Sequence, residues 1–206
     1  MSRYLGPKLK ITRRLGELPG FTQKTSNRKK TPGQHGTEIN FESDINTFSN
    51  YGRRLMEKQK LRYNYGLSES KLLSYVTKAK KKRGSTGILL LQMLELRLDN
   101  IVYKLGFAPT IQFSRQIIQH KHILVNNKSV NIPSFQCAIG DKITLCPKSK
   151  LAQNNWPSFQ IKSAKFLEIF NNNTTQQRLG VVTQIPDRTD TEIEINELFV
   201  IEYYSR

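Results

Sequence analysis

Cysteine is scarce in this sequence. The 206 residues include two cysteines, Cys137 and Cys146, which are too few for a disulfide framework or for a zinc site of their own. The three histidines add no CxxC or HxxxH spacing, so the ligand pattern of a structural zinc site is missing as well. We therefore expect two structural thiols in a reducing compartment, and neither a metal nor any other cofactor.

Long apolar runs are also missing. The longest clean run, Ile88 to Leu91 with a resumption after Gln92, is far shorter than the ~20 residues that span a bilayer. The chain opens with "MSRYLGPKLK" and enters basic sequence without the apolar segment of a secretory signal. We expect no membrane span and no cleaved presequence.

The sequence contains none of the common catalytic motifs G-x-S-x-G, G-x-x-x-x-G-K-[ST] and G-x-G-x-x-G. One string, "LRLDN" at 96–100, resembles the R-L-D around the catalytic aspartate of pseudouridine synthases, which makes Asp99 a candidate. The simpler interpretation is an aspartate near a helix start, where the helix dipole favours it, because no large catalytic domain accompanies it. We predict a protein with no enzymatic activity, no catalytic residues and no small-molecule substrate; an RNA-modifying enzyme is the alternative.

Acidic residues are few: 16 Asp and Glu stand against 33 Lys and Arg, for a net charge of +17. Residues 1–83 hold 20 basic and 6 acidic residues, whereas residues 151–206 hold 5 and 7. This charge favours a polyanionic partner, with an anionic membrane surface as the rival. The accompanying Asn, Gln, His and Tyr suit folded RNA, and no helix-turn-helix spacing points to DNA.

The sequence divides into three parts. Residues 1–47 combine Gly-Pro and Pro-Gly breakers with many cations, which predicts an extended basic N-terminal arm that orders against a partner. Residues 48–93 and 160–206 are expected to form a helical domain, and residues 94–159 a small α/β unit with a linker from 148 to 158. The expected fold class is α+β, a mostly helical domain with an inserted small α/β module.

Apolar spacing and capping signals predict the individual elements. Helices are expected over 50–65, 69–83, 85–98, 98–106, 110–120 and 196–204. Strands are expected at 123–125, from Val130 onward and at 141–145, with short elements in 159–170 and 179–186. The expected N-caps are Ser68 and Asn196, and the expected buried face of helix 69–83 is Leu72, Leu73, Val76 and Ala79.

Two of the predicted helices carry clustered cations. Arg54, Lys58 and Arg62 lie four residues apart, which forms a stripe of about 6 Å per step, close to the spacing of phosphates along a strand. Helix 69–83 ends in a dense basic run from Lys78 to Arg83. One or two cations would satisfy the helix dipole, so the excess indicates contact with an anionic partner.

The segment "LELRLDNIVYKLGFAPTIQFSRQIIQHKHILVNNKSVNIPSFQCAIGDKI" resembles the S4-type RNA-binding domain. Further strings, "MSRYLGPKLKITRR", "TPGQHG", "YGRRLMEKQKLRYNYGL", "RGSTG" and "INELFVIEYYSR", resemble the small-subunit ribosomal protein S-four family. The strings "LGELPGF", "YNYGLSE" and "HKHILVN" are closest to its plastid members. The resemblance covers nearly the whole chain and is weakest at 147–190.

The resemblance implies a monomer within the ribosome that binds the 5′ domain of small-subunit rRNA and nucleates assembly of the subunit body. It also implies contact with the fifth small-subunit protein and a role in accuracy with that protein and the twelfth. It implies a plastid, stromal location, with the bacterial cytoplasm as the alternative. Some relatives bind zinc through N-terminal cysteines, but residues 1–47 contain none, so no metal is expected.

Two sets of candidate residues follow from charge, position and resemblance. The expected rRNA-binding residues are Arg3, Lys8, Arg13, Arg14, His35, Arg53, Arg54, Lys58, Lys60, Arg62, Tyr63, Lys80, Lys81, Lys82, Arg83, Arg97, Arg115, Gln116, Gln119, His120, Lys121, Asn126 and Lys128. The expected protein-partner residues, in the acidic C-terminal part, are Asp187, Asp190, Glu192, Glu194, Glu197, Leu198 and Tyr203.

Overall fold

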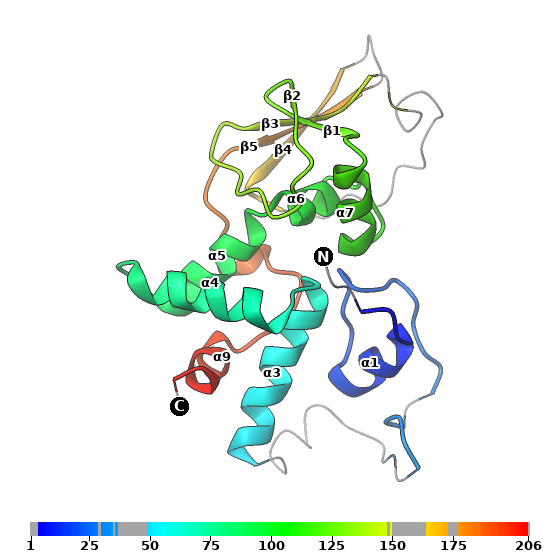
Figure 1. Cartoon of the computed structure of the whole chain (residues 1–206), viewed down its shortest axis with the longest axis vertical. Helices are drawn as coiled ribbons and strands as arrows, with labels where there is room; N and C mark the ends of the chain where they lie inside the picture. The colour runs from blue at the N-terminus through cyan, green and yellow to red at the C-terminus, as the bar shows by residue number, and fades with distance from the viewer. Residues whose placement is uncertain are drawn as a thin grey trace. The chain divides into compact units, whose positions relative to one another are not determined.

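The computed structural model describes residues 4–28, 30–34, 36, 49–147, 149, 164–172 and 177–205. Arg3, His35 and most of the predicted 148–158 linker lie outside these residues. The chain forms two compact units, residues 1–90 with 192–206 and residues 91–191, whose elements are labelled in Figure 1. The α+β prediction is confirmed.

The N-terminal segment is not simply extended. Helix α1 spans Lys8–Leu15, and the buried side chains of Leu15, Leu18 and Phe21 form a small cluster with Tyr63 of helix α3, Asn50–Asn64. The prediction of an arm without a core of its own was therefore wrong for this part. Its apolar residues pack on one another and on a tyrosine 42 or more positions away in the sequence.

Three further helices build the first unit. They are α3, Asn50–Asn64, α4, Glu69–Lys81, and α9, Glu197–Tyr203, whose cap Asn196 accepts a hydrogen bond from the Leu198 amide as predicted. The buried face of α4 differs from the prediction at one position, because Leu73 is 48% exposed and Tyr75 is buried. Leu72, Tyr75, Val76 and Ala79 follow the regular spacing of a single helix face.

Helix α5, Thr86–Glu95, leads into the second unit. Its helices are α6, Leu98–Lys104, and α7, Ile111–Gln119, which is capped by the hydroxyl of Thr110. Its strands are β1, Ile123–Val125, β2, Lys128–Ser129, β3, Lys142–Leu145, β4, Leu167–Asn172, and β5, Gln177–Val182. They form one antiparallel sheet in the order β2-β1-β3-β5-β4, with α6 and α7 on one side of it (Figure 1).

Strands β4 and β5 change the expected domain boundary. We assigned residues 160–206 to the helical domain, but β5 pairs with β3 through Thr144 and Leu179, and Phe166 and Val182 are fully buried in the core of the second unit. This pairing covers an edge of β3 that would otherwise present unpaired backbone groups. Strand β2 also begins two positions earlier than the predicted Val130.

Residues 183–191, which follow β5, also belong to the second unit. The short 3-10 helix η1, Arg188–Asp190, is held by the buried ammonium of Lys104, which donates to the Asp190 carbonyl at 2.6 Å and pairs with Glu95 at 2.5 Å. Residues up to 191 therefore belong with the sheet, and those from 192 with the helices. None of the helices in the described ranges is long and apolar enough to cross a membrane.

Candidate nucleic-acid interface

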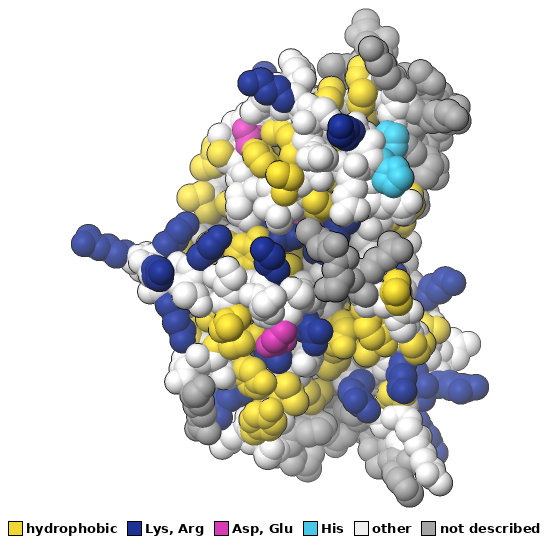
Figure 2. All heavy atoms as spheres, viewed as in Figure 1, with side chains coloured by type: hydrophobic (Ala, Val, Ile, Leu, Met, Phe, Trp, Pro, Cys, Tyr) yellow, Lys and Arg dark blue, Asp and Glu magenta, His cyan; other side chains and the backbone are white. Residues whose placement is uncertain are grey.

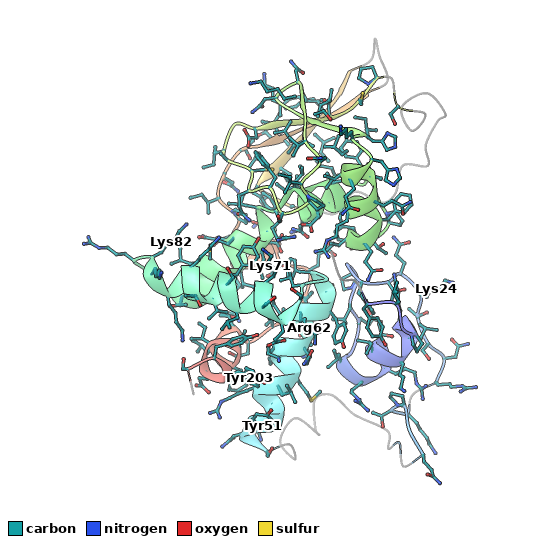
Figure 3. All side chains as sticks on the ribbon, viewed as in Figure 1. Lys24, Tyr51, Arg62, Lys71, Lys82 and Tyr203 are labelled. Carbon is teal, nitrogen blue, oxygen red and sulfur yellow. The ribbon has the colours of Figure 1, made fainter. Side chains whose placement is uncertain are left out.

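The end of α4 is an exposed cluster of cations, which we call the α4 basic end and define as Lys78, Lys80, Lys81, Lys82 and Arg83. All five side chains are exposed. Figure 2 shows a group of Lys and Arg side chains on the left, on the side where Figure 3 labels Lys82. Within the described part of the chain none of them pairs with a carboxylate; Lys80 donates to the Tyr204 carbonyl and the Ser205 hydroxyl at 3.3 Å. This cluster is therefore available to external anions.

The stripe on α3 meets protein groups instead. Arg54 pairs with Glu202 at 2.6 Å, and Lys58 pairs with Glu69 at 2.9 Å while its ammonium lies 4.4 Å from the centre of the Tyr203 ring. Lys58 is only 4% exposed. The four-residue spacing correctly predicted one helix face, but α4 and α9 supply carboxylates and an aromatic ring to that face, so Lys58 is not a surface cation.

Some cations of α1 form hydrogen bonds within the N-terminal segment, and others are exposed. Lys8 donates to the Phe21 carbonyl at 3.1 Å, and burial, together with the charge of Lys24, lowers its pKa below the usual value. The guanidinium of Arg13 donates to the Lys30 carbonyl at 2.6 and 3.0 Å. These two side chains tie the N-terminal segment together, whereas Arg14 is exposed.

The corner between α7 and β1 presents Gln116, Gln119, His120 and Lys121, all exposed. In the hairpin turn that follows, Asn126 donates to the Asp141 carboxylate at 2.8 Å and accepts from the Lys142 amide at 3.0 Å. Asn126 thereby fixes the β1–β2 turn against β3. The turn and the corner form a polar and basic edge of the second unit.

Asp99 lies at the centre of a buried ion cluster. Its carboxylate accepts from Arg97 at 2.7 and 3.0 Å and from Arg115 at 2.8 Å, and it is only 1% exposed. A carboxylate enclosed in this way cannot reach a substrate, which argues against the catalytic interpretation. Arg97 is 3% exposed, so this predicted RNA-binding residue instead compensates a buried charge.

The predicted RNA-binding residues thus fall into three groups by exposure. The exposed ones are Arg14, Lys80, Lys81, Lys82, Arg83, Gln116, Gln119, His120, Lys121, Asn126 and Lys128. The partly buried ones are Lys8, Arg13, Arg53, Arg54, Lys60, Arg62, Tyr63 and Arg115. Lys58 and Arg97 are buried. Among cations absent from the prediction, Lys71 on α4 and Lys142 on β3 are exposed; as isolated lysines they gave no pattern.

The predicted partner surface is also reduced by burial. Asp190 is 3% exposed, and its carboxylate accepts from the Lys165 and Asp187 amides at 2.8 Å. Glu197 is 9% exposed, with its side chain packed against the Cα of Gly87. These two residues are therefore structural, while Asp187, Glu194 and Leu198 remain exposed.

An aromatic depression lies in the first unit. It has a volume of about 430 Å³ and is lined by Tyr51, Arg54, Leu73, Tyr203 and Tyr204; Tyr51 and Tyr203 are labelled in Figure 3. The Tyr204 hydroxyl donates to Glu69 at 2.6 Å, and burial and that carboxylate raise the tyrosine's pKa well above its usual value. Of these residues, Arg54 was predicted as an rRNA-binding residue and Tyr203 as a partner residue; the depression itself was not predicted, because no local pattern joins Tyr51 to residues 152 positions later.

Cysteine and histidine are the residue types that most often act as metal ligands and nucleophiles, so the described ones are the candidates for such chemistry. Among the residues that the structure describes, no three His, Cys, Asp or Glu side chains gather to hold a metal. Burial raises the pKa of Cys137 to about 12, assisted by Asp141 and Asp99. A thiol held in the neutral form is a poor nucleophile.

Comparison with known proteins agrees with this division into two units. Residues 3–95 match the ribosomal protein S4/S9 N-terminal domain, and residues 96–143 match the S4 domain. The chain is 50% identical over 206 residues to the small ribosomal subunit protein uS4c of Oltmannsiellopsis viridis, covering all of both chains. It is 49% identical to the protein of the same name from Prototheca wickerhamii, over 100% of this chain and 99% of that one.

A ribosomal protein S4/S9 N-terminal domain followed by an S4 domain defines a class of small-subunit ribosomal proteins. Identity of about one half along the full length is specific enough to assign membership within that class. The chain belongs to the ribosomal protein S4 family.

Proposed function

We propose that the chain is a structural protein of the small subunit of a plastid ribosome, located in the stroma, and that it binds the 5′ domain of small-subunit rRNA. The observation that carries the proposal is the α4 basic end, whose five cations are exposed and unpaired with any carboxylate that the structure describes. Cations positioned this way bind phosphate by releasing counterions. The names of the relatives, small ribosomal subunit protein uS4c, support the same function.

The second unit contributes a separate surface. The polar edge of Gln116, Gln119, His120, Lys121 and Lys128 combines amides, imidazole and ammonium groups, which suit the sugar hydroxyls and base edges of folded RNA. Two surfaces on two units can engage different parts of one rRNA domain. Such a protein can stabilise the domain early, in keeping with a role in nucleating assembly of the subunit body.

The test is binding of the purified full-length chain to a transcript of the 5′ domain, with tRNA as control, across a salt series. Tight binding to the transcript, with a steep fall of affinity as salt increases, is the expected result. Equal affinity for both RNAs would leave only a general RNA-binding protein, and the RNA-modification alternative would then need its own assay on Asp99. The enclosure of Asp99 by two arginines makes that alternative the weaker one.

We also propose that α9 contacts the fifth small-subunit protein and that this contact contributes, with the twelfth protein, to translational accuracy. Leu198 is 61% exposed, and α9 also contributes Tyr203 to the aromatic depression. Replacing Leu198 by Glu should weaken binding of the fifth protein in a pull-down and change miscoding, while rRNA affinity stays the same. Ile139→Glu, at another exposed apolar residue that lies outside the predicted partner set, is the matched surface control; lost rRNA affinity in Leu198→Glu would assign α9 a folding role instead.

A further inference from the structure

Helix α7 ends in an unusual way for this chain. Three helices end with the same two hydrogen bonds, in which the residue after the cap and its successor donate back to the last turn: Gly66 and Leu67 after α3, Gly106 and Phe107 after α6, and Lys121 and His122 after α7. This motif requires a left-handed residue, normally glycine. Gly66 and Gly106 meet the requirement with φ of 58° and 74°, whereas Lys121 takes it with φ of 61°.

A lysine is strained in this conformation, because its Cβ crowds the following carbonyl. The other described non-glycine residues with positive φ are Asn126 and Asn127 in the hairpin turn, and asparagine tolerates that region. The chain avoids this strain after α3 and α6, where it has glycine, and accepts it after α7. This difference indicates that the Lys121 side chain has a function. Because the Lys121 side chain is exposed, we expect that function to be contact with another molecule.

The two neighbours of Lys121 form a pair of parallel rings. The imidazoles of His120 and His122 are tilted by 9° with centroids 6.0 Å apart, and Figure 2 shows the described histidines together on the surface of the second unit. His122 is held by a 2.9 Å hydrogen bond between its Nδ1 and the Ser149 hydroxyl. Burial and the neighbouring His120 lower the pKa of His122 below its usual value, which keeps that ring neutral at neutral pH.

The described acidic groups around this corner are already engaged. Asp99 is enclosed by Arg97 and Arg115, and the two oxygens of Asp141 accept from Asn126 and the Ala138 amide. The corner therefore combines an ammonium with flat aromatic faces and with the exposed amides of Gln116 and Gln119. An ammonium binds a phosphate, an aromatic face stacks on a base, and amides bond to base edges.

We propose that the corner His120-Lys121-His122 binds one unpaired RNA nucleotide, with its base on the imidazole of His120 and its phosphate at the ammonium of Lys121. The inference rests on the proposed function and deepens it, because it assigns single-stranded nucleotides to this corner. A paired base would not serve, since its face is already stacked within the helix. The left-handed backbone of Lys121 sets the direction in which its side chain leaves the corner, so the backbone of the corner is formed before RNA arrives.

The experiment measures affinity of the full-length chain for the 5′-domain transcript across a salt series at constant pH. The variant Lys121→Gly places at this position the residue that follows α3 and α6. Its melting temperature should be at least that of the parent and up to about 4 °C higher, because the backbone strain is relieved. Its affinity should fall, and its salt slope should decrease by about 0.7–0.9, the contribution of one phosphate contact. The matched variant Lys121→Arg should keep the slope.

Stacking is tested separately with His120→Ala and His120→Tyr. Loss of the ring should weaken binding about fivefold to a hundredfold with no change in salt slope, and tyrosine should restore binding because it keeps a flat face. A fully paired RNA duplex should bind His120→Ala as well as it binds the parent. His120→Ala or Lys121→Gly at parental affinity and slope would overturn the inference while selective parental binding upholds the proposed function. Loss of selectivity in the parent itself would overturn both.

Discussion

Helices α3 and α4 are adjacent in the sequence and both are strongly basic, yet their cations meet different partners. On α3, Arg54 and Lys58 lie against carboxylates at 2.6 and 2.9 Å. At the α4 basic end, Lys81, Lys82 and Arg83 are exposed and form no ion pair with the described carboxylates. A run of positive charge in a sequence therefore predicts an anionic partner, but it does not say whether that partner lies in another molecule or in the same chain.

The partners that decide the outcome are distant in the sequence. Glu202 lies 148 positions from Arg54, and Tyr203 covers Lys58 from the same C-terminal helix. Such pairing is visible only after α9 has packed against α3. We therefore expect paired cations to contribute to stability and exposed cations to contribute to RNA affinity.

The largest effect is expected where pairing is most complete, at Asp99. Replacing Asp99 by Asn leaves Arg97 and Arg115 without their buried counter-charge, which should cost about 3–5 kcal/mol of unfolding free energy. Chemical denaturation of the purified chain measures this loss. The exposed Glu194→Gln removes the same charge and should change stability by less than about 0.5 kcal/mol; an Asp99→Asn protein as stable as the parent would contradict the structural role of the cluster.

The next effect contrasts the two helices directly with variants that each remove three charges. Changing Lys81, Lys82 and Arg83 together to Gln should lower the salt slope of rRNA binding by about 2–3, which amounts to about 3 kcal/mol at 0.1 M salt relative to 1 M. Its melting temperature should stay near that of the parent. Changing Arg54, Lys58 and Arg62 together to Gln should do the reverse, with a lower melting temperature and a slope close to the parent. If both variants showed the same salt slope of rRNA binding, the cations of α3 and of the α4 basic end would not differ in their contribution to RNA affinity.

Local patterns were enough to predict much of the fold. The span of α3, strand β1 and the Asn196 cap of α9 are confirmed, because capping and apolar spacing act over a few residues. The small N-terminal core and the pairing of β5 with β3 were missed, since both depend on contacts between distant segments. For the same reason the sequence could nominate Lys58 and Lys82 alike, and only packing separates them. The assignment of Lys82 to rRNA binding stays a prediction, whereas we expect the buried Lys58 to stabilise the fold instead.

A single paired cation should show a smaller effect. Lys58→Ala removes the ion pair with Glu69, the contact with the Tyr203 ring and the packing of a buried aliphatic stem, and should cost about 2 kcal/mol of unfolding free energy. Its rRNA salt slope should match the parent. Lys71→Ala, an exposed lysine on α4 labelled in Figure 3, is the control and should leave stability within about 0.5 kcal/mol. A changed slope in Lys58→Ala would return this residue to the RNA-binding set.

The smallest effect concerns the carboxylate that pairs with Lys58. Partial burial acts to raise the pKa of Glu69, but hydrogen bonds from Tyr204 and Lys58 outweigh it and hold the pKa below the usual value of 4.5. A lowered folded-state pKa contributes stability above the unfolded pKa, and this is lost as pH falls through the folded value. The gap in unfolding free energy between the parent and Glu69→Gln should therefore be constant near neutral pH and shrink below about pH 4.5. Because the Glu69 side chain is 44% exposed, solvent screening keeps the pH-dependent part of this difference below about 1 kcal/mol. A difference in unfolding free energy that grows as the pH falls would mean that folding raises the pKa of Glu69 instead of lowering it.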